Sequence, residues 1–193
     1  MRDIEHLEKF KKCIKATYPI NTYMSNSNYK SIEYCRILIN SPKLVRDIKL
    51  KGVVYNKSLI IKYPNKDMLD EIYYRHFIRG YFDGDGSILL SHNSSYYKSY
   101  DGIIKYVYPT YNFTILGTKN FLKQIISNAE FKYAKIRNTK TEQIKSLNIC
   151  AKKEFDYIFN YLYLDSTIKL ERKYNKWYEI KSAFAAGAVK QMR

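Results

Sequence analysis

The chain has 193 residues, 46% of them hydrophobic, so it can form one sizeable domain or two small ones around a buried core. Lys and Arg number 34 against 18 Asp and Glu, and the resulting charge of +16 favours nucleic acid or anionic lipid as a partner. No run approaches the roughly 18 apolar residues of a membrane span, and the start has no signal-peptide h-region. The three cysteines are far apart with no CxxC, so we expect neither a zinc site nor a disulfide framework. We therefore expect a cytoplasmic or organellar-matrix protein with no membrane partner.

Residues 1–65 predict a helix, a hairpin and a second helix. Apolar residues recur at helical spacing over 3–16, and strands are expected at 20–24 and 32–39 around a polar turn at 25–28. Ser41 is expected to cap a helix over 42–50, with Pro42 at its first position and Gly52 after its end. Residues 59–63 are expected to be extended. This first region is predicted to be a partial structural unit.

Residues 66–182 predict a longer order, α-β-β-α-β-β-α, followed by one more helix. A hairpin followed by a helix recurs at 18–50, 87–129 and 133–163, which indicates a repeat at the level of pattern. We expect a complete unit over 66–182 and a poorly patterned tail over 183–193. The expected helices are 68–83, 119–129 (capped by Thr118), 153–164 and 167–182; the expected strands are 87–92, 105–116, 134–138 and 144–150, with 93–102 a polar exposed segment.

The segment FIRGYFDGDG, residues 77–86, combines two carboxylates with three of the seven glycines. Asp85 follows the expected helix end, where the helix dipole disfavours a carboxylate unless a divalent cation binds there. Gly80, inside the helix, indicates that another backbone approaches closely. Gly84 and Gly86 are expected to adopt positive φ as the chain turns into the next strand. The pattern indicates metal-assisted chemistry on a polyanion.

The residues GYFDGDGS at 80–87 resemble the motif of the LAGLIDADG homing endonucleases of the dodecapeptide (DOD) type. Residues 41–45 with Gly52 and 57–59 resemble the approach to the second motif in two-motif members, and 170–174 resemble the C-terminal helix. The resemblance covers most of the chain. It implies an α+β fold with antiparallel, saddle-shaped sheets, in which the first unit lacks its motif helix and first hairpin.

The same resemblance implies site-specific, metal-dependent hydrolysis of phosphodiesters in double-stranded DNA, with Mg²⁺ or another divalent cation. It makes Asp85 the metal ligand and catalytic carboxylate, with Asp83 in support at the turn and Gly86 offering a carbonyl oxygen to the same ion. Gly80 would pack against a second motif helix. Candidates for a basic residue near the centre are Lys145 and Lys152, with solvated surface lysines as the alternative.

The strands of the hairpins are expected to turn one face toward DNA, because side chains alternate along a strand. Basic and polar side chains in these strands can contact guanine, adenine or phosphate. The candidates are His92, Lys98, Lys105, Tyr111, Arg137, Lys140 and Lys145.

A single motif supplies half of a paired site, so a homodimer or a complementing half is the expected partner. The leading interpretation is a homing endonuclease of a mobile intron or intein, or from a free-standing gene. The alternative is a catalytically inactive DNA-binding relative of maturase-like or regulatory type. A third hypothesis, an RNA-binding structural protein, depends only on the charge and on the 21 tyrosines.

Overall fold

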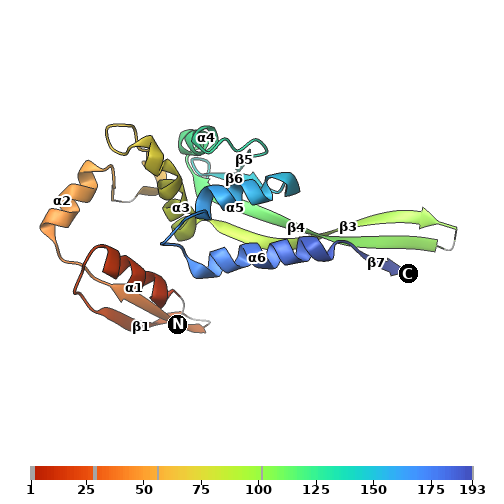
Figure 1. The fold of residues 1–193 in the computed structure, drawn as a ribbon, viewed down its shortest axis with the longest axis horizontal. Helices are drawn as coiled ribbons and strands as arrows, with labels where there is room; N and C mark the ends of the chain where they lie inside the picture. Colours follow the sequence, from red (N-terminus) through yellow and green to blue (C-terminus); the bar gives the residue numbers. More distant parts are fainter. Residues whose placement is uncertain (1–2, 28–29, 56, 101, 193) are drawn as a thin grey trace.

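The computed structural model describes residues 3–27, 30–55, 57–100 and 102–192. The fold is α+β with antiparallel sheets, as the sequence predicts. Most helices gather in a body at one end, and a long hairpin projects from it (Figure 1). Within these described ranges, no helix is both long enough and apolar enough to cross a bilayer.

The N-terminal unit is a two-stranded sheet between two helices: α1 Ile4–Cys13, β1 Ile20–Ser27, β2 Lys30–Ile37 and α2 Pro42–Leu50. The Ser41 side chain accepts a 3.2 Å hydrogen bond from the Leu44 N–H, which confirms the predicted cap. Gly52 follows α2 with φ 82°. The predicted turn at 25–28 is too early, because β1 continues to Ser27; residues 28 and 29 lie outside the described ranges.

Polar contacts join this unit to the start of the last helix, α6 Glu171–Ala186. Lys9 pairs with Glu171 at 2.5 Å, and the Arg172 guanidinium donates to the Asp3 carboxylate at 3.1 Å. Among the residues before Tyr63 whose burial is described (3–25, 33–55 and 57–62), no side chain is buried. These side chains therefore form no buried core of their own within the N-terminal unit.

The larger unit follows the predicted order. Two short 3₁₀ turns, η1 Lys57–Leu59 and η2 Glu71–Tyr73, lie between α2 and the motif helix. The segment 59–63, expected to be extended, therefore starts in a turn. Asp70 accepts a hydrogen bond from the Ile72 N–H and sets η2, which explains why the motif helix begins at Tyr74 rather than at 68. The other elements are α3 Tyr74–Asp85, β3 Ser87–Ser99, β4 Gly102–Gly117, α4 Lys119–Asn128, β5 Lys135–Asn138, β6 Lys145–Ile149, η3 Lys152–Glu154, α5 Phe155–Tyr163, α6 and β7 Val189–Met192.

The main sheet has the order β3-β4-β6-β5, with β7 beside β4, and all of its pairs are antiparallel. The helices of the larger unit cover one face of it. The Phe82 ring of α3 stacks on Phe113 of β4 with centroids 4.6 Å apart, and Trp177 of α6 is only 1% exposed. Aromatic burial of this extent supplies most of the stabilisation of such a core.

Two predictions about where elements end are wrong. The described residues of 93–102 are mostly exposed, as predicted, but the strands do not stop at 92 and resume at 105. Strands β3 and β4 continue as a pair almost to the hairpin tip, with Tyr97 opposite Ile104 and its ring 5.5 Å from that of Tyr106. The residues expected to form a separate tail continue α6 to Ala186 and then form β7, which pairs with β4 from Ile104 to Val107. The projecting hairpin, called the arm below, is thus three-stranded over part of its length.

Candidate functional site

Asp83 and Asp85, the two carboxylates of the motif, lie in different environments at the end of α3. Asp83 is 5% exposed; its Oδ1 accepts a 2.7 Å hydrogen bond from the Tyr163 hydroxyl, and its Oδ2 accepts a 3.0 Å bond from the Leu170 N–H. Burial raises the pKa of Asp83, and these two hydrogen bonds oppose the shift. Both oxygens are used inside the fold, so Asp83, which was expected to support Asp85 at the turn, ties the end of α3 to the start of α6.

A buried lysine caps the same end of α3. The Lys173 ammonium donates hydrogen bonds to the carbonyl oxygens of Phe82 at 2.5 Å, Asp83 at 2.9 Å and Gly86 at 2.5 Å. A cation here offsets the negative end of the helix dipole and satisfies carbonyls that have no helical partner. Burial lowers the pKa of Lys173 to about 8. The Gly86 carbonyl, predicted to bind metal, is thus already engaged by a cation.

Gly86 is required for a different reason from the predicted one. Neither Gly84 nor Gly86 has positive φ; the Gly86 backbone is extended, at φ −82° and ψ 172°. A Cβ atom at Gly86 would lie 2.3 Å from the Phe82 ring and 2.8 Å from the Phe82 carbonyl oxygen. Only a glycine therefore lets β3 leave the helix so close to the buried Phe82 ring.

Asp85 is the exposed carboxylate of the pair. Its side chain is 48% exposed, and its Oδ2 lies 2.6 Å from the Lys57 ammonium. That ammonium also lies over the Tyr81 ring, 5.0 Å from the centroid. The Tyr81 ring is held by a 3.0 Å hydrogen bond from its hydroxyl to the Leu116 carbonyl. Burial raises the pKa of Tyr81, and the charge of Asp85 adds to the shift.

The surroundings of Asp85 fit one half of a divalent-metal site. A carboxylate is the oxygen ligand that Mg²⁺ and Ca²⁺ prefer, and the Lys57 ammonium shows that a positive charge is accommodated there. In the part of the chain that the structure describes, no group of three His, Cys, Asp or Glu side chains is placed to hold a metal ion. Further oxygen ligands would therefore have to come from a second motif helix, from water or from phosphate.

The two lysines expected near this centre make other contacts. The Lys152 ammonium lies over the Phe184 ring, 4.9 Å from its centroid, and the Lys145 ammonium donates to the Asn138 side chain at 3.1 Å. The lysine that contacts Asp85 is Lys57, which comes from the segment between α2 and α3. A long-range contact of this kind leaves no signal in local sequence spacing.

The α3 face that carries Gly80 and Gly84 is open. Both glycines are exposed, and a Cβ atom added to either would meet no heavy atom within 4 Å. Positions four residues apart share one face of a helix. The close backbone approach expected at Gly80 is therefore not made within the described residues.

The strand register divides the predicted DNA contacts between the two faces of the main sheet. Ile88 pairs with Phe113 on the helix-covered face, and alternation places Tyr111 on this face too. Tyr111 is 1% exposed, and its hydroxyl donates to the Ala151 carbonyl at 3.0 Å, so its prediction as a DNA contact is wrong. Three more candidates have the same parity but lie farther out along the arm: His92, Lys98 and Lys105.

The opposite face, called the open face below, is largely polar over the body, with Leu89 and Leu116 as exposed apolar side chains. Arg137 belongs to the open face. It pairs with Ser146, and Ser146 pairs with Leu116, whose side chain points to the face opposite to that of Phe113. Lys140 is exposed in the turn between β5 and β6. A hydrogen-bonded group on this face was not predicted, although alternation counted from the apolar strand residues could have found it. It consists of Thr114, Ser146 and Asn148, with Thr114 donating to Asn148 at 3.2 Å. Asn112 lies on the same face.

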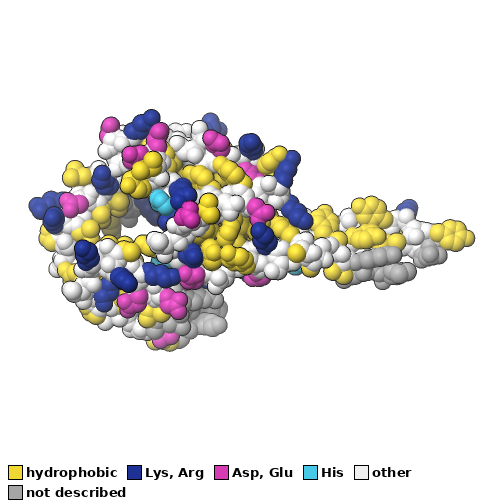
Figure 2. All heavy atoms as spheres, in the orientation of Figure 1, with side chains coloured by type: hydrophobic (Ala, Val, Ile, Leu, Met, Phe, Trp, Pro, Cys, Tyr) yellow, Lys and Arg dark blue, Asp and Glu magenta, His cyan; other side chains and the backbone are white. Residues whose placement is uncertain are grey.

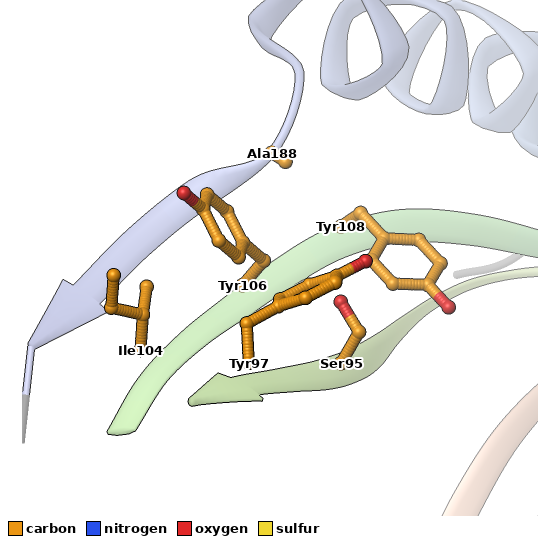
Figure 3. A pocket seen from close by; sticks show the side chains of 6 residues that line it. All are labelled: Ser95, Tyr97, Ile104, Tyr106, Tyr108 and Ala188. Atoms are coloured by element: carbon orange, nitrogen blue, oxygen red, sulfur yellow. The ribbon is translucent and has the colours of Figure 1, made fainter. Parts of the chain in front are cut away.

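On the arm, the open face becomes aromatic. Its side chains surround a groove that Ala188 closes from the C-terminal segment (Figure 3). Lys and Arg side chains are spread over the body, whereas the arm is largely hydrophobic in this view (Figure 2). The groove is lined by Ser95, Tyr97, Ile104, Tyr106, Tyr108 and Ala188.

Comparisons with known proteins found similarity in structure but none in sequence. No protein-family model matches the sequence, and no curated protein is similar to it in sequence. The structure is similar to the I-LtrWI LAGLIDADG homing endonuclease bound to target DNA, with 14% identity, a TM-score of 0.52, and coverage of 96% of this chain and 76% of that one. It is also similar to the LAGLIDADG meganuclease I-AabMI bound to uncleaved DNA, with 10% identity, a TM-score of 0.50, and coverage of 96% and 78%. The chain therefore has the LAGLIDADG homing endonuclease fold.

Proposed function

We propose that this chain is part of a site-specific DNA endonuclease that hydrolyses phosphodiesters in duplex DNA with a divalent cation, Mg²⁺ being the natural choice. One observation carries the proposal: in this fold, the exposed Asp85 carboxylate stands at the end of the motif helix, where β3 of the open-faced sheet begins. The charge of +16 supplies the electrostatic attraction that duplex DNA requires.

Each residue at the end of α3 has a distinct part in this proposal. Asp85 would hold the cation, while Asp83 and Lys173 fix the helix end from inside the fold. A bound divalent cation would stabilise the developing charge on the phosphate and lower the pKa of a water molecule. The open face would lie against the DNA, with Arg137 and Asn148 among the side chains able to contact base edges.

A second half is part of the proposal, either a second copy or a complementing chain. The open Gly80 and Gly84 face offers a surface for another motif helix. The N-terminal unit also leaves apolar side chains uncovered: Phe10 is 40% exposed and Val45 is 43% exposed. In the larger unit, by contrast, the helix between the two hairpins, α4, buries Phe121, Leu122 and Ile125. This contrast in burial between the two units supports a partner segment that covers the N-terminal unit.

Cleavage of a randomised duplex library tests the proposal. The purified chain is incubated with the library and Mg²⁺, and the new ends are sequenced. Wild type should give ends at a common sequence, and Asp85→Asn should give none. Asp156→Asn is the matched control, because Asp156 is an exposed carboxylate of α5 whose recorded partner is Lys181. Equal cleavage by wild type and Asp85→Asn would refute the assignment of Asp85.

The second candidate function is DNA binding without cleavage. It is favoured because the motif has a single exposed carboxylate, Asp85, and this carboxylate is paired with Lys57. It predicts salt-sensitive duplex binding that is the same for wild type and Asp85→Asn, with no Mg²⁺-dependent ends from either. Tighter binding to structured RNA than to duplex DNA would count against both candidates.

A further inference from the structure

Lys57 is a half-buried lysine that makes two contacts, both with residues of the motif helix. Its side chain is 48% exposed, as is that of Asp85, and the two groups are 2.6 Å apart. The Tyr81 ring supports the same ammonium from another side, and Tyr81 is itself anchored to Leu116 and packed on Phe121 with centroids 4.8 Å apart. The ammonium therefore has a defined position beside the carboxylate.

The contact occupies the carboxylate on which the proposed function depends. An exposed lysine–carboxylate pair is weak, because water screens it and both side chains lose rotamer freedom. A divalent cation that coordinates the carboxylate directly replaces such a pair, since it carries twice the charge and prefers oxygen ligands. After the exchange, the cation–π contact with Tyr81 can still hold the ammonium beside the site.

We propose that Lys57 is the cationic residue of the Asp85 centre: it neutralises Asp85 in the metal-free protein, gives way to a divalent cation, and then faces the phosphate bound at that cation. The second step rests on the function proposed above. The assignment replaces Lys145 and Lys152, whose ammonium groups contact Asn138 and Phe184 instead.

Metal binding tests the first step without any cleavage assay. Tb³⁺ is titrated into the protein, and its luminescence, sensitised by neighbouring tyrosines, reports binding. Lys57→Met should bind Tb³⁺ about three- to tenfold more tightly than wild type, because a competing and repelling charge is gone. Asp85→Asn should lose this binding. Lys66→Met is the matched control, since Lys66 is an exposed lysine of the same segment paired with Glu71, and it should match wild type. Equal or weaker binding by Lys57→Met overturns the proposal.

Duplex binding in Ca²⁺ tests the second step. A random-sequence duplex is titrated at several salt concentrations against wild type, Lys57→Met and Lys66→Met. Lys57→Met should bind more weakly, and the slope of log affinity against log salt should fall by about 1, as for the loss of one phosphate contact. Tighter Tb³⁺ binding with unchanged duplex binding would restrict Lys57 to a counter-ion and overturn the phosphate contact. If wild type itself shows no salt-dependent duplex binding, the proposed function fails together with the phosphate step, while the Tb³⁺ titration still decides whether Lys57 competes for Asp85.

Discussion

The hydroxyl of Tyr163 donates a 2.7 Å hydrogen bond to Oδ1 of Asp83, two residues before the exposed carboxylate of the motif. The bond joins the end of α5 to the end of α3, and the Leu170 N–H completes the link from the start of α6. One motif carboxylate therefore organises three helix ends, and the other, Asp85, is the exposed one that pairs with Lys57.

Tyr163→Phe should lower the free energy of unfolding by about 1.5 to 3 kcal/mol, because it removes a buried hydrogen bond to a carboxylate without changing the packed ring. Urea unfolding at pH 7 followed by circular dichroism measures the change. Tyr178→Phe is the control, because Tyr178 is 49% exposed and its hydroxyl bonds to that of another tyrosine, Tyr174. A change in Tyr163→Phe as small as in the control would show that the bond contributes little.

Lys173 should give the protein a distinctive pH dependence above pH 8. Its pKa is about 8 in the folded protein against an ordinary value of 10.5, so between these values the unfolded chain binds more protons. The contribution of Lys173 to the free energy of unfolding must then rise with pH, by at most about 1.4 kcal/mol per unit. The advantage of wild type over Lys173→Met should therefore be larger at pH 9 than at pH 7. Urea titrations at both values measure it.

The control for this pH dependence is Lys176→Met, because Lys176 is an α6 lysine paired with Glu179 at the surface. Its difference from wild type should be the same at both pH values. A Lys173→Met difference that stays constant or shrinks with rising pH would contradict the lowered pKa.

Two glycines of the motif should respond to alanine in opposite directions. Gly80→Ala should raise the free energy of unfolding by about 0.5 to 1 kcal/mol, because the position is an open helical site and alanine is the better helix former. Gly86→Ala should lower it by about 1 to 3 kcal/mol, since the new methyl group would collide with Phe82. Thermal unfolding of the two variants in parallel measures both, and equal signs would contradict the packing described here.

A substitution at Gly80 also tests whether the open α3 face that carries Gly80 and Gly84 is the interface with a second copy of the chain. Gly80→Leu should leave the isolated chain folded but block close approach of another helix. Light scattering after size exclusion should show loss of any dimer formed by wild type, whereas Asp156→Asn should assemble normally. Assembly of Gly80→Leu at the wild-type concentration would exclude this face as the interface.

Local signals in the sequence were sufficient for much of the fold. Ser41 and Thr118 cap helices where predicted, because the capping hydrogen bond involves residues only three positions apart. The strands on either side of 93–102 were predicted too short, because the polar and serine-rich residues of this segment are tolerated in a strand exposed on both faces.

The site was less predictable, since its geometry depends on contacts distant in sequence. Lys173 reaches the end of α3 from about ninety residues away, and Lys57 reaches Asp85 across the segment between the units. Tyr111 was placed on the wrong face because alternation in one strand does not show which of its two sets of side chains lies under the helices. The strand register and the buried Phe113 show that Tyr111 belongs to the helix-covered set.

The polar side chains of the open face are expected to recognise bases, and Asn148 allows a test. Asn148 lies there within a polar network, accepting from Thr114 at 3.2 Å and donating to the Ser146 hydroxyl at 2.8 Å. If this face enters the major groove, Asn148→Ala should relax the preference at one or two positions of the preferred site, by about 1 to 3 kcal/mol per base pair. Lys98→Ala, on the opposite parity of the arm, should instead weaken binding nearly uniformly across sequences. Binding to the library, followed by sequencing of bound and free fractions, measures both effects. The opposite result would contradict the prediction: if Asn148→Ala keeps the wild-type base preference at every position and Lys98→Ala alters that preference, the face that carries Lys98 contacts the bases.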